Sequence, residues 1–196
     1  MYYQQSCSDI ARTAFLIFIH RMDFAIHIRP AGITDTWLIS EIARKTFMET
    51  YGEMNTPENM EAYLNAQFSE DKISEELQNS HARYFIAFLD DIPVAFTKVR
   101  DDRHVSKLEQ TRALEVQRIY VLQEYQGFRI GKAMLDMVKS LASAEAYQTI
   151  WLQVWQKNNK AIRFYQKAGF IVFETASFTL GNDVQQDFLM RFDLYY

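Results

Sequence analysis

Apolar and polar residues alternate along several short segments of the chain, a pattern typical of strands with one buried face. The predicted strands are 24–29, 84–89, 92–99, 113–122, 149–155, 170–178 and 188–193. The pair Asp90-Asp91 between the second and third segments predicts a hairpin turn. Gly181-Asn182 falls in the connection between the last two segments, which we expect to pair antiparallel.

Other segments carry apolar residues at helical spacing. The predicted helices are 35–51, 58–67, 70–79, 130–141 and 158–168. Thr56 followed by Pro57 is a helix start, Asn158 is an N-cap, and Gly169 ends a helix. The helix from residue 130 is expected to bury one face, formed by Ile130, Ala133, Met134, Met137, Val138 and Leu141.

The order of these segments predicts the fold class. A helix connects 113–122 to 149–155, so these two strands are expected to lie parallel, whereas the hairpins give antiparallel neighbours. The result is a mixed sheet covered by helices, an α/β domain of three layers.

Residues 126–133, with the sequence Gln-Gly-Phe-Arg-Ile-Gly-Lys-Ala, join the end of a strand to the start of a helix. The first N–H groups of a helix lack partners and carry partial positive charge, so such a loop favours an anion. Gly127 and Gly131 allow close approach of a ligand, and Lys132 adds a charge. The nucleotide-binding Gly-Lys-Ser/Thr sequence is absent, because Ala133 follows Lys132. Phosphate binding is indicated, although an ordinary glycine-containing turn has the same local pattern.

Residues 158–170 form a second motif, Asn-Asn-Lys-Ala-Ile-Arg-Phe-Tyr-Gln-Lys-Ala-Gly-Phe. Ala161, Phe164, Tyr165 and Ala168 share one face of the predicted helix, which on these grounds is an aromatic-faced helix packed on a sheet.

The two motifs together resemble the signatures of the Gcn5-related N-acetyltransferases (GNAT). The first is similar to their pyrophosphate loop, Gln/Arg-x-x-Gly-x-Gly/Ala, and the second to Asn-x-x-Ala-x-x-Phe-Tyr-x-Lys-x-Gly-Phe. Gln126 and Gly131 match the loop pattern, whereas Arg129 stands in place of its first glycine. The resemblance implies a mixed sheet with splayed parallel strands and binding of acetyl-coenzyme A as acetyl donor, without a metal.

The same resemblance assigns site residues. Those implied to bind the cofactor are Ile119, Tyr120, Val121, Gln126, Gly127, Phe128, Arg129, Ile130, Gly131, Lys132, Asn158 and Tyr165. Tyr165 matches the family tyrosine that protonates the leaving thiolate. Glu115 stands where some members place a general base, while other members pass the proton along water, and a structural role for Glu115 is an equal alternative.

A closer resemblance covers roughly residues 24–192. The segments 46–50, 55–64, 118–121, 151–155 and 178–190 look like the bacterial spermidine/spermine acetyltransferases of the sporulation-regulator (PaiA-like) branch. This implies a small cationic amine as acceptor. Acetylation of another small-molecule or protein amine, or non-catalytic binding of acetyl-coenzyme A by a regulator, are the alternatives.

Composition and charge restrict the partners. The formal net charge of −4 disfavours nucleic-acid binding. Residues 118–167 hold eight Lys and Arg against three acidic residues, which suits the phosphates of coenzyme A. Residues 41–76 hold nine acidic residues against three basic ones, which suits a cationic acceptor or simply solvated helix faces. Phe188, Leu189 and Phe192 could pack against a second copy in a homodimer.

The chain length of 196 residues suits one domain. The apolar run 14–19 is shorter than the roughly 20 residues that a bilayer requires, so we expect no transmembrane segment there. Residues 1–21 look unlike the rest of the chain, and we expect them to lie outside the fold and the acetyltransferase domain to span 22–196. The single cysteine, Cys7, fits a reducing cytoplasm, and the four scattered histidines show no metal-ligand spacing.

Overall fold

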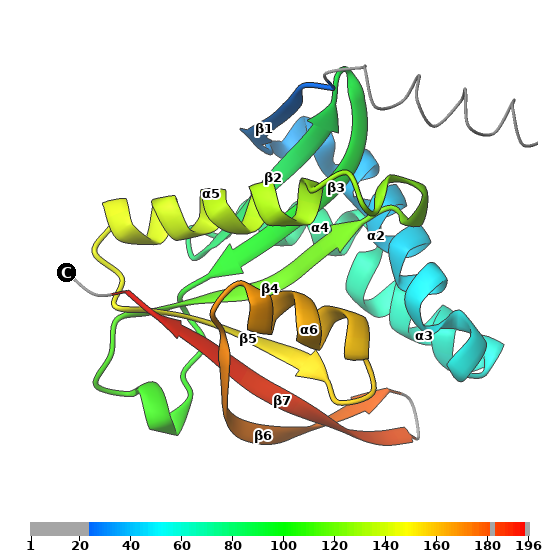
Figure 1. The fold of residues 1–196 in the computed structure, drawn as a ribbon. Coiled ribbons are helices and arrows are strands. Elements are labelled where there is room, and N and C mark those ends of the chain that lie inside the picture. The colour runs from blue at the N-terminus through cyan, green and yellow to red at the C-terminus, as the bar shows by residue number, and fades with distance from the viewer. Residues whose placement is uncertain (1–23, 181–182, 195–196) are drawn as a thin grey trace, which may run out of the picture.

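The fold is a seven-stranded mixed sheet covered by helices on both faces (Figure 1). The computed structural model describes residues 24–180 and 183–194. The strand order is β1-β2-β3-β4-β5-β7-β6. The strands are β1 (Ile26–Pro30), β2 (Ala82–Leu89), β3 (Ile92–Arg100), β4 (Ala113–Val121), β5 (Thr149–Trp155), β6 (Ile171–Leu180) and β7 (Asp183–Asp193). The helices are α2 (Thr36–Tyr51), α3 (Pro57–Phe68), α4 (Glu70–Leu77), α5 (Ile130–Ala144) and α6 (Asn159–Lys167). This confirms the predicted fold class.

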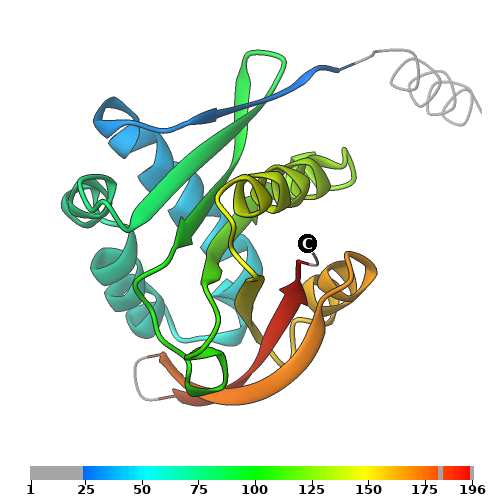
Figure 2. The ribbon, with the colours of Figure 1, turned by 90° about the vertical axis from the view of Figure 1, so that its left-hand side faces the viewer.

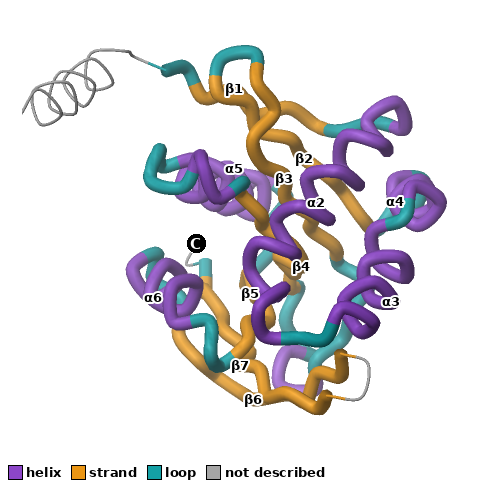
Figure 3. The backbone as a smooth tube through the Cα atoms, turned by 90° about the vertical axis from the view of Figure 1, so that its right-hand side faces the viewer, coloured by secondary structure: helices purple, strands orange, loops and turns teal. Residues whose placement is uncertain are grey.

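The helices divide between the two faces of the sheet (Figures 2 and 3). α2, α3 and α4 cover one face over a core that includes Ile39, Phe68 and Phe96. α5 and α6 cover the other face, where Leu135 and Tyr165 pack onto β4 and β5. The stretch rich in acidic residues therefore lies on one face of the sheet, and both sequence motifs begin the helices of the other.

The helix ends follow the predicted signals. The Thr56 hydroxyl accepts a hydrogen bond from the Asn59 N–H at 3.3 Å, and the Asn158 side chain accepts one from the Ala161 N–H at 3.0 Å. Gly169 has a φ of +92°, a left-handed conformation that favours glycine, and the chain turns there into β6.

The predicted buried face of α5 is partly wrong. Leu135 and Ala142 are fully buried, whereas Ala133, Met137 and Leu141 keep part of their surface. The reason is that α5 packs on two clusters in succession. Its first turns bury Ile130 and Met134 against β2 and β3, and its later turns bury Leu135 and Ala142 against β4 and β5. The buried stripe is consequently oblique to the helix axis.

The C-terminal hairpin is longer than the sequence predicted. β7 begins at Asp183 rather than 188, because antiparallel pairing with β6 continues through polar residues whose pattern is not strand-like. The expected connection at Gly181-Asn182 and the expected extension at 1–21 lie outside the described residues. Leu189 is 4% exposed, and Phe192 packs on Phe170 with ring centroids 5.6 Å apart. Phe188 and Phe192 are partly buried against the core, and the expected contact with a second copy stays a prediction.

Candidate active site

The parallel strands β4 and β5 separate partway along their length (Figure 1). They pair only over Ala113–Glu115 and Thr149–Trp151, although β4 continues to Val121 and β5 to Trp155. Beyond that point β4 is bonded to β3 and β5 to β7, each on its outer edge. The inner edge of β4 at 119–121 therefore offers main-chain groups to a ligand that enters between the two strands.

The turn after β4 leads into the N-terminus of α5. The Ala133 N–H bonds the Arg129 carbonyl at 3.0 Å, so the N–H groups of Ile130, Gly131 and Lys132 precede the first helical hydrogen bond and point out of the helix end. Gly127 has a φ of +99° and Arg129 a φ of +62°. Arg129 thus adopts the left-handed backbone that the family's glycine would adopt easily, at a cost of about 1–2 kcal/mol for a residue with a Cβ.

Gly131 lies inside α5, where its backbone does not require glycine. A Cβ at this position would lie 3.6 Å from Cζ of Phe164 and 3.8 Å from Cγ2 of Val121, both ordinary van der Waals distances. The protein could therefore accommodate alanine. A Cβ there would occupy the space next to Phe164 of α6.

The side chains of Gln126, Phe128 and Lys132 in this loop have partners within the protein. The Gln126 side chain donates to the Val121 carbonyl at 3.0 Å and accepts a hydrogen bond from the Lys160 ammonium at the start of α6. Lys132 forms an ion pair with Asp136 on the helix surface. Phe128 packs edge-on against Phe24. Ile130 is buried, so only its main chain faces the loop.

Tyrosines from four elements gather at the gap between β4 and β5. They are Tyr51 and Tyr63 on the helical layer, Tyr120 on β4 and Tyr165 on α6. Burial raises the pKa of Tyr165 above its ordinary value, and Tyr51 adds to the shift. Burial likewise raises the pKa of Tyr51 to about 12, against a hydrogen bond from Asn158 that lowers it. Tyr165 is therefore a neutral hydroxyl at any physiological pH.

Asn158 connects the start of α6 to the end of α2. Besides capping α6, its side chain hydrogen-bonds Tyr51 of α2. A pocket of about 250 Å³ lies at this junction, lined by Thr50, Met54, Trp155, Lys157, Asn158, Asn159 and Lys160. The structure thus brings the second motif to an open pocket beside the separated strands.

Glu115 lies where the two strands part, opposite Trp151. It is 1% exposed, and its Oε1 accepts a hydrogen bond from Arg103 at 2.8 Å. Its Oε2 lies 3.0 Å from Nε of Arg100 in an ion pair. Burial raises the pKa of Glu115, whereas Arg103 and Arg100 act against that shift.

Comparison with known proteins identifies the family to which this chain belongs. The sequence profile of the acetyltransferase (GNAT) family matches residues 41–170, which include both motifs and the parting strands. The chain belongs to the GNAT family. It is therefore an N-acetyltransferase whose acetyl donor is acetyl-coenzyme A. Its similarity to relatives extends over most of the chain.

Two sequence relatives of this GNAT enzyme are similar over nearly their full length. An uncharacterised N-acetyltransferase of Lactobacillus delbrueckii subsp. lactis is 29% identical over 76% of this chain and 87% of the relative. A spermidine N(1)-acetyltransferase of Thermoplasma acidophilum is 27% identical over 77% of this chain and 91% of the relative.

Solved structures of other GNAT proteins are similar to this fold. The PaiA N-acetyltransferase of Thermoplasma acidophilum, crystallised with coenzyme A, superposes with a TM-score of 0.71 at 25% identity, covering 87% of this chain and 99% of that one. A GNAT protein of Rhodopseudomonas palustris superposes with a TM-score of 0.70 at 19% identity, covering 89% and 99%, and shares the fold.

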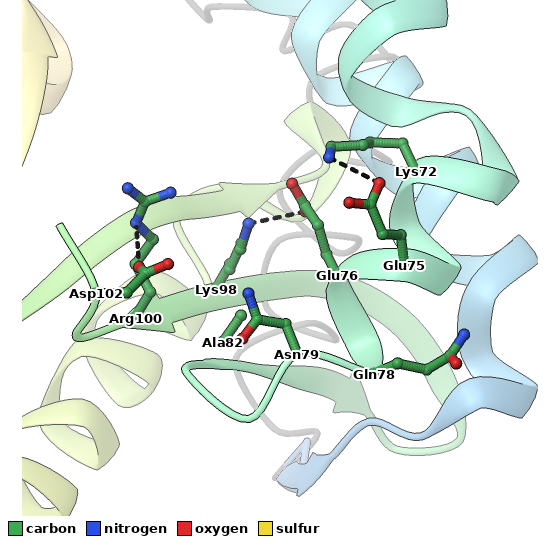
Figure 4. A pocket seen from close by; sticks show the side chains of 9 residues that line it. All are labelled: Lys72, Glu75, Glu76, Gln78, Asn79, Ala82, Lys98, Arg100 and Asp102. Carbon is green, nitrogen blue, oxygen red and sulfur yellow. Dashed lines mark hydrogen bonds and ion pairs between the residues drawn. The ribbon is translucent and has the colours of Figure 1, made fainter.

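A second pocket of about 270 Å³ lies under α4, lined by none of the motif residues (Figure 4). Its charged side chains neutralise one another. Lys72 pairs with Glu75 at 2.9 Å, and Lys98 pairs with Glu76 at 2.8 Å. Arg100 lies 3.1 Å from Asp102 as well as beside Glu115. The three basic and three acidic side chains of the lining balance in charge, and the lining holds none of the motif residues, so we do not place the GNAT reaction in this pocket.

Sequence patterns missed two of the groups beside the cleft. Tyr51 ends a helix that was predicted for its buried face alone, and Asp187 lies in a segment of β7 that was not predicted as strand. Within the described residues, no group of His, Cys, Asp and Glu has the arrangement of a metal site, and no helix is long and apolar enough to cross a membrane.

Proposed function

We propose that this enzyme transfers the acetyl group of acetyl-coenzyme A to a primary amine of a small polyamine such as spermidine, by direct attack within a ternary complex. The observation that carries the proposal is the gap between β4 and β5, where the 119–121 edge of β4 is not paired with β5 and a neutral buried tyrosine lies beside it. Acetyl-coenzyme A supplies a thioester, whose carbonyl carbon accepts the amine.

The residues around the gap suit the parts of that molecule. The N–H groups at the start of α5, the backbone of Gln126–Gly131 and the charge of Lys132 suit the pyrophosphate. The main chain of Ile119, Tyr120 and Val121 suits the amide groups of the pantetheine arm. To bind that arm, the Val121 carbonyl would give up its hydrogen bond from the Gln126 side chain. Asn158, at the mouth of the pocket, suits the same arm.

Two proton movements complete the transfer. As the new C–N bond forms and the C–S bond breaks, the nitrogen loses a proton and the departing sulfur gains one. Tyr165 is the proposed donor to sulfur, because its raised pKa keeps the hydroxyl protonated. For removal of the amine proton, Glu115 and a path through water to bulk solvent both stay as proposals. The two arginine partners of Glu115 would oppose its protonation.

The polyamine acceptor is supported by the 27% identical spermidine N(1)-acetyltransferase and by the acidic helical layer beside the cleft. A polyamine carries several positive charges at neutral pH, and nine acidic residues fall within 41–76 on that layer. The substrates implied are metabolites of the cytoplasm, where we place the enzyme.

The test measures release of free thiol from acetyl-coenzyme A with a panel of amines, using wild type and Tyr165→Phe. Turnover should fall by about 10²–10⁴-fold in the variant. Affinity for coenzyme A should change little, because the hydroxyl acts as the thiolate departs. The free energy of unfolding should change by at most about 0.5–1.5 kcal/mol.

Tyr147→Phe is the matched control, because Tyr147 is also a buried tyrosine but lies away from the cleft. Its hydroxyl donates a hydrogen bond of 2.7 Å to Asp101. This variant should lose stability and keep turnover. A Tyr165→Phe enzyme with near-normal turnover, measured where chemistry limits the rate, would exclude Tyr165 as the proton donor. Absence of thiol release with every amine would exclude the proposed function.

A further inference from the structure

A buried carboxylate lies beside the cleft, outside both sequence motifs. Asp187 on β7 is 6% exposed and sits directly opposite Trp155 in the register of β5 and β7. Its Oδ2 accepts a hydrogen bond from Nε2 of Gln153 at 2.8 Å. Its Oδ1 is buried and has no hydrogen-bond partner among residues 24–180 and 183–194. A buried carboxylate oxygen without a partner is costly, so it needs a donor from elsewhere.

A chain of side chains fixes the orientation of this carboxylate. Arg103 donates to Oε1 of Gln153 at 2.9 Å and to Oε1 of Glu115 at 2.8 Å. Arginine can only donate, so the Gln153 amide must turn its NH₂ group to Asp187. Gln153 therefore holds Oδ2 in place, and Oδ1 is left for another cation or donor. The nearby positive charge, Arg103, is hydrogen-bonded to Gln153 and Glu115 rather than to Asp187.

Aromatic rings surround the same region. Trp155 lines the pocket at the start of α6, and its ring centroid lies 5.9 Å from that of Tyr51. Tyr63 lies edge-on to Phe178 at 6.0 Å. Burial is the main cause of the raised pKa of Tyr51 and Tyr63, and the charge of Asp187 adds to both shifts. A carboxylate among aromatic faces is suited to an alkylammonium ion.

The position of Asp187 relative to Tyr165 indicates which ammonium it would hold. Directly opposed residues of an antiparallel pair point to the same face of a sheet, so Asp187 lies on the face of Trp155, whose ring packs on Tyr51 of α2. Tyr165 packs from α6 on the other face, with Leu152 and Val154 of β5. We infer that Asp187 binds a second, non-reacting ammonium group of the acceptor, and so selects diamines and polyamines over monoamines. This inference rests on the proposed function.

The experiment compares cadaverine with n-pentylamine, which share one carbon chain and differ in the second ammonium group. Wild type and Asp187→Asn are assayed for thiol release. Binding of each amine to the enzyme–coenzyme A complex is measured by calorimetry. Asparagine keeps the shape of Asp187 and an oxygen for Gln153, so folding should be retained. Glu109→Gln, an exposed residue outside both the acidic layer and the motifs, is the control for loss of one negative charge.

In Asp187→Asn, we expect the KM and Kd of cadaverine to rise about 10- to 100-fold, as for loss of one charge-assisted hydrogen bond. Those of n-pentylamine and of coenzyme A should change less than about twofold, and Glu109→Gln should behave as wild type. Equal losses for both amines, or unchanged selectivity, would overturn the inference while thiol release still supports the proposed function. Asp187-dependent binding of cadaverine without thiol release would support the inference and exclude the proposed function.

Discussion

Replacement of Gly131 by alanine separates the needs of the fold from those of the ligand. The added Cβ would meet only Phe164 and Val121, at 3.6 and 3.8 Å, and the backbone there is ordinary helix. Alanine is favoured over glycine in a helix by about 1 kcal/mol, and by less in the first turn. The free energy of unfolding of the ligand-free protein should therefore rise by about 0.3–1 kcal/mol.

The affinity for coenzyme A should change in the opposite direction. If the pyrophosphate approaches the α5 N-terminus at Gly131, a methyl group there overpacks the contact, at a cost of about 1–3 kcal/mol. At 1.4 kcal/mol for each factor of ten, the dissociation constant should increase about 5- to 150-fold. Urea denaturation gives the first quantity and titration calorimetry with coenzyme A gives the second.

Gly32→Ala is the control, because Gly32 has open space around its missing Cβ and lies outside both motifs. It should leave coenzyme A affinity unchanged. The reasoning fails if Gly131→Ala destabilises the ligand-free protein, since the fold itself would then require glycine. It also fails if the affinity is unchanged, since no ligand would then approach this position.

Three further predictions concern strain, buried charge and pH. Arg129→Gly should change the free energy of unfolding by less than about 1 kcal/mol, because relief of left-handed strain is offset by the entropy of glycine, whereas a β-branched residue there should destabilise measurably in urea. Glu115→Gln should lower the free energy of unfolding by about 3 kcal/mol, because Arg100 and Arg103 lose a buried partner. A variant of normal stability and much slower turnover would contradict this and would favour Glu115 as the general base. Burial lowers the pKa of Lys98 from 10.5 to about 8. Between these two pH values the unfolded chain binds a proton that the folded chain lacks, so the free energy of unfolding should rise with pH. The urea midpoint should therefore rise across that pH window in wild type but not in Lys98→Met.

Local sequence predicted the features that depend on nearby residues. Alternating apolar positions located β2, β3, β4 and β5, and the caps at Thr56, Asn158 and Gly169 marked helix ends, because a cap is a contact within three or four residues. The two motifs predicted the strand–loop–helix that leads to α5 and the helix that carries Tyr165. Family resemblance supplied the roles of these residues, which periodicity alone does not contain.

The tertiary structure decided the contacts between distant segments. Whether Glu115 is free or paired depends on Arg103, and whether Asp187 keeps an unpaired oxygen depends on Gln153 from another strand. The oblique stripe of α5 depends on the two clusters below it. Such contacts join residues 12 or more positions apart, where no local period carries a signal. They are fixed only when the strands pair and their polar side chains must find partners away from water.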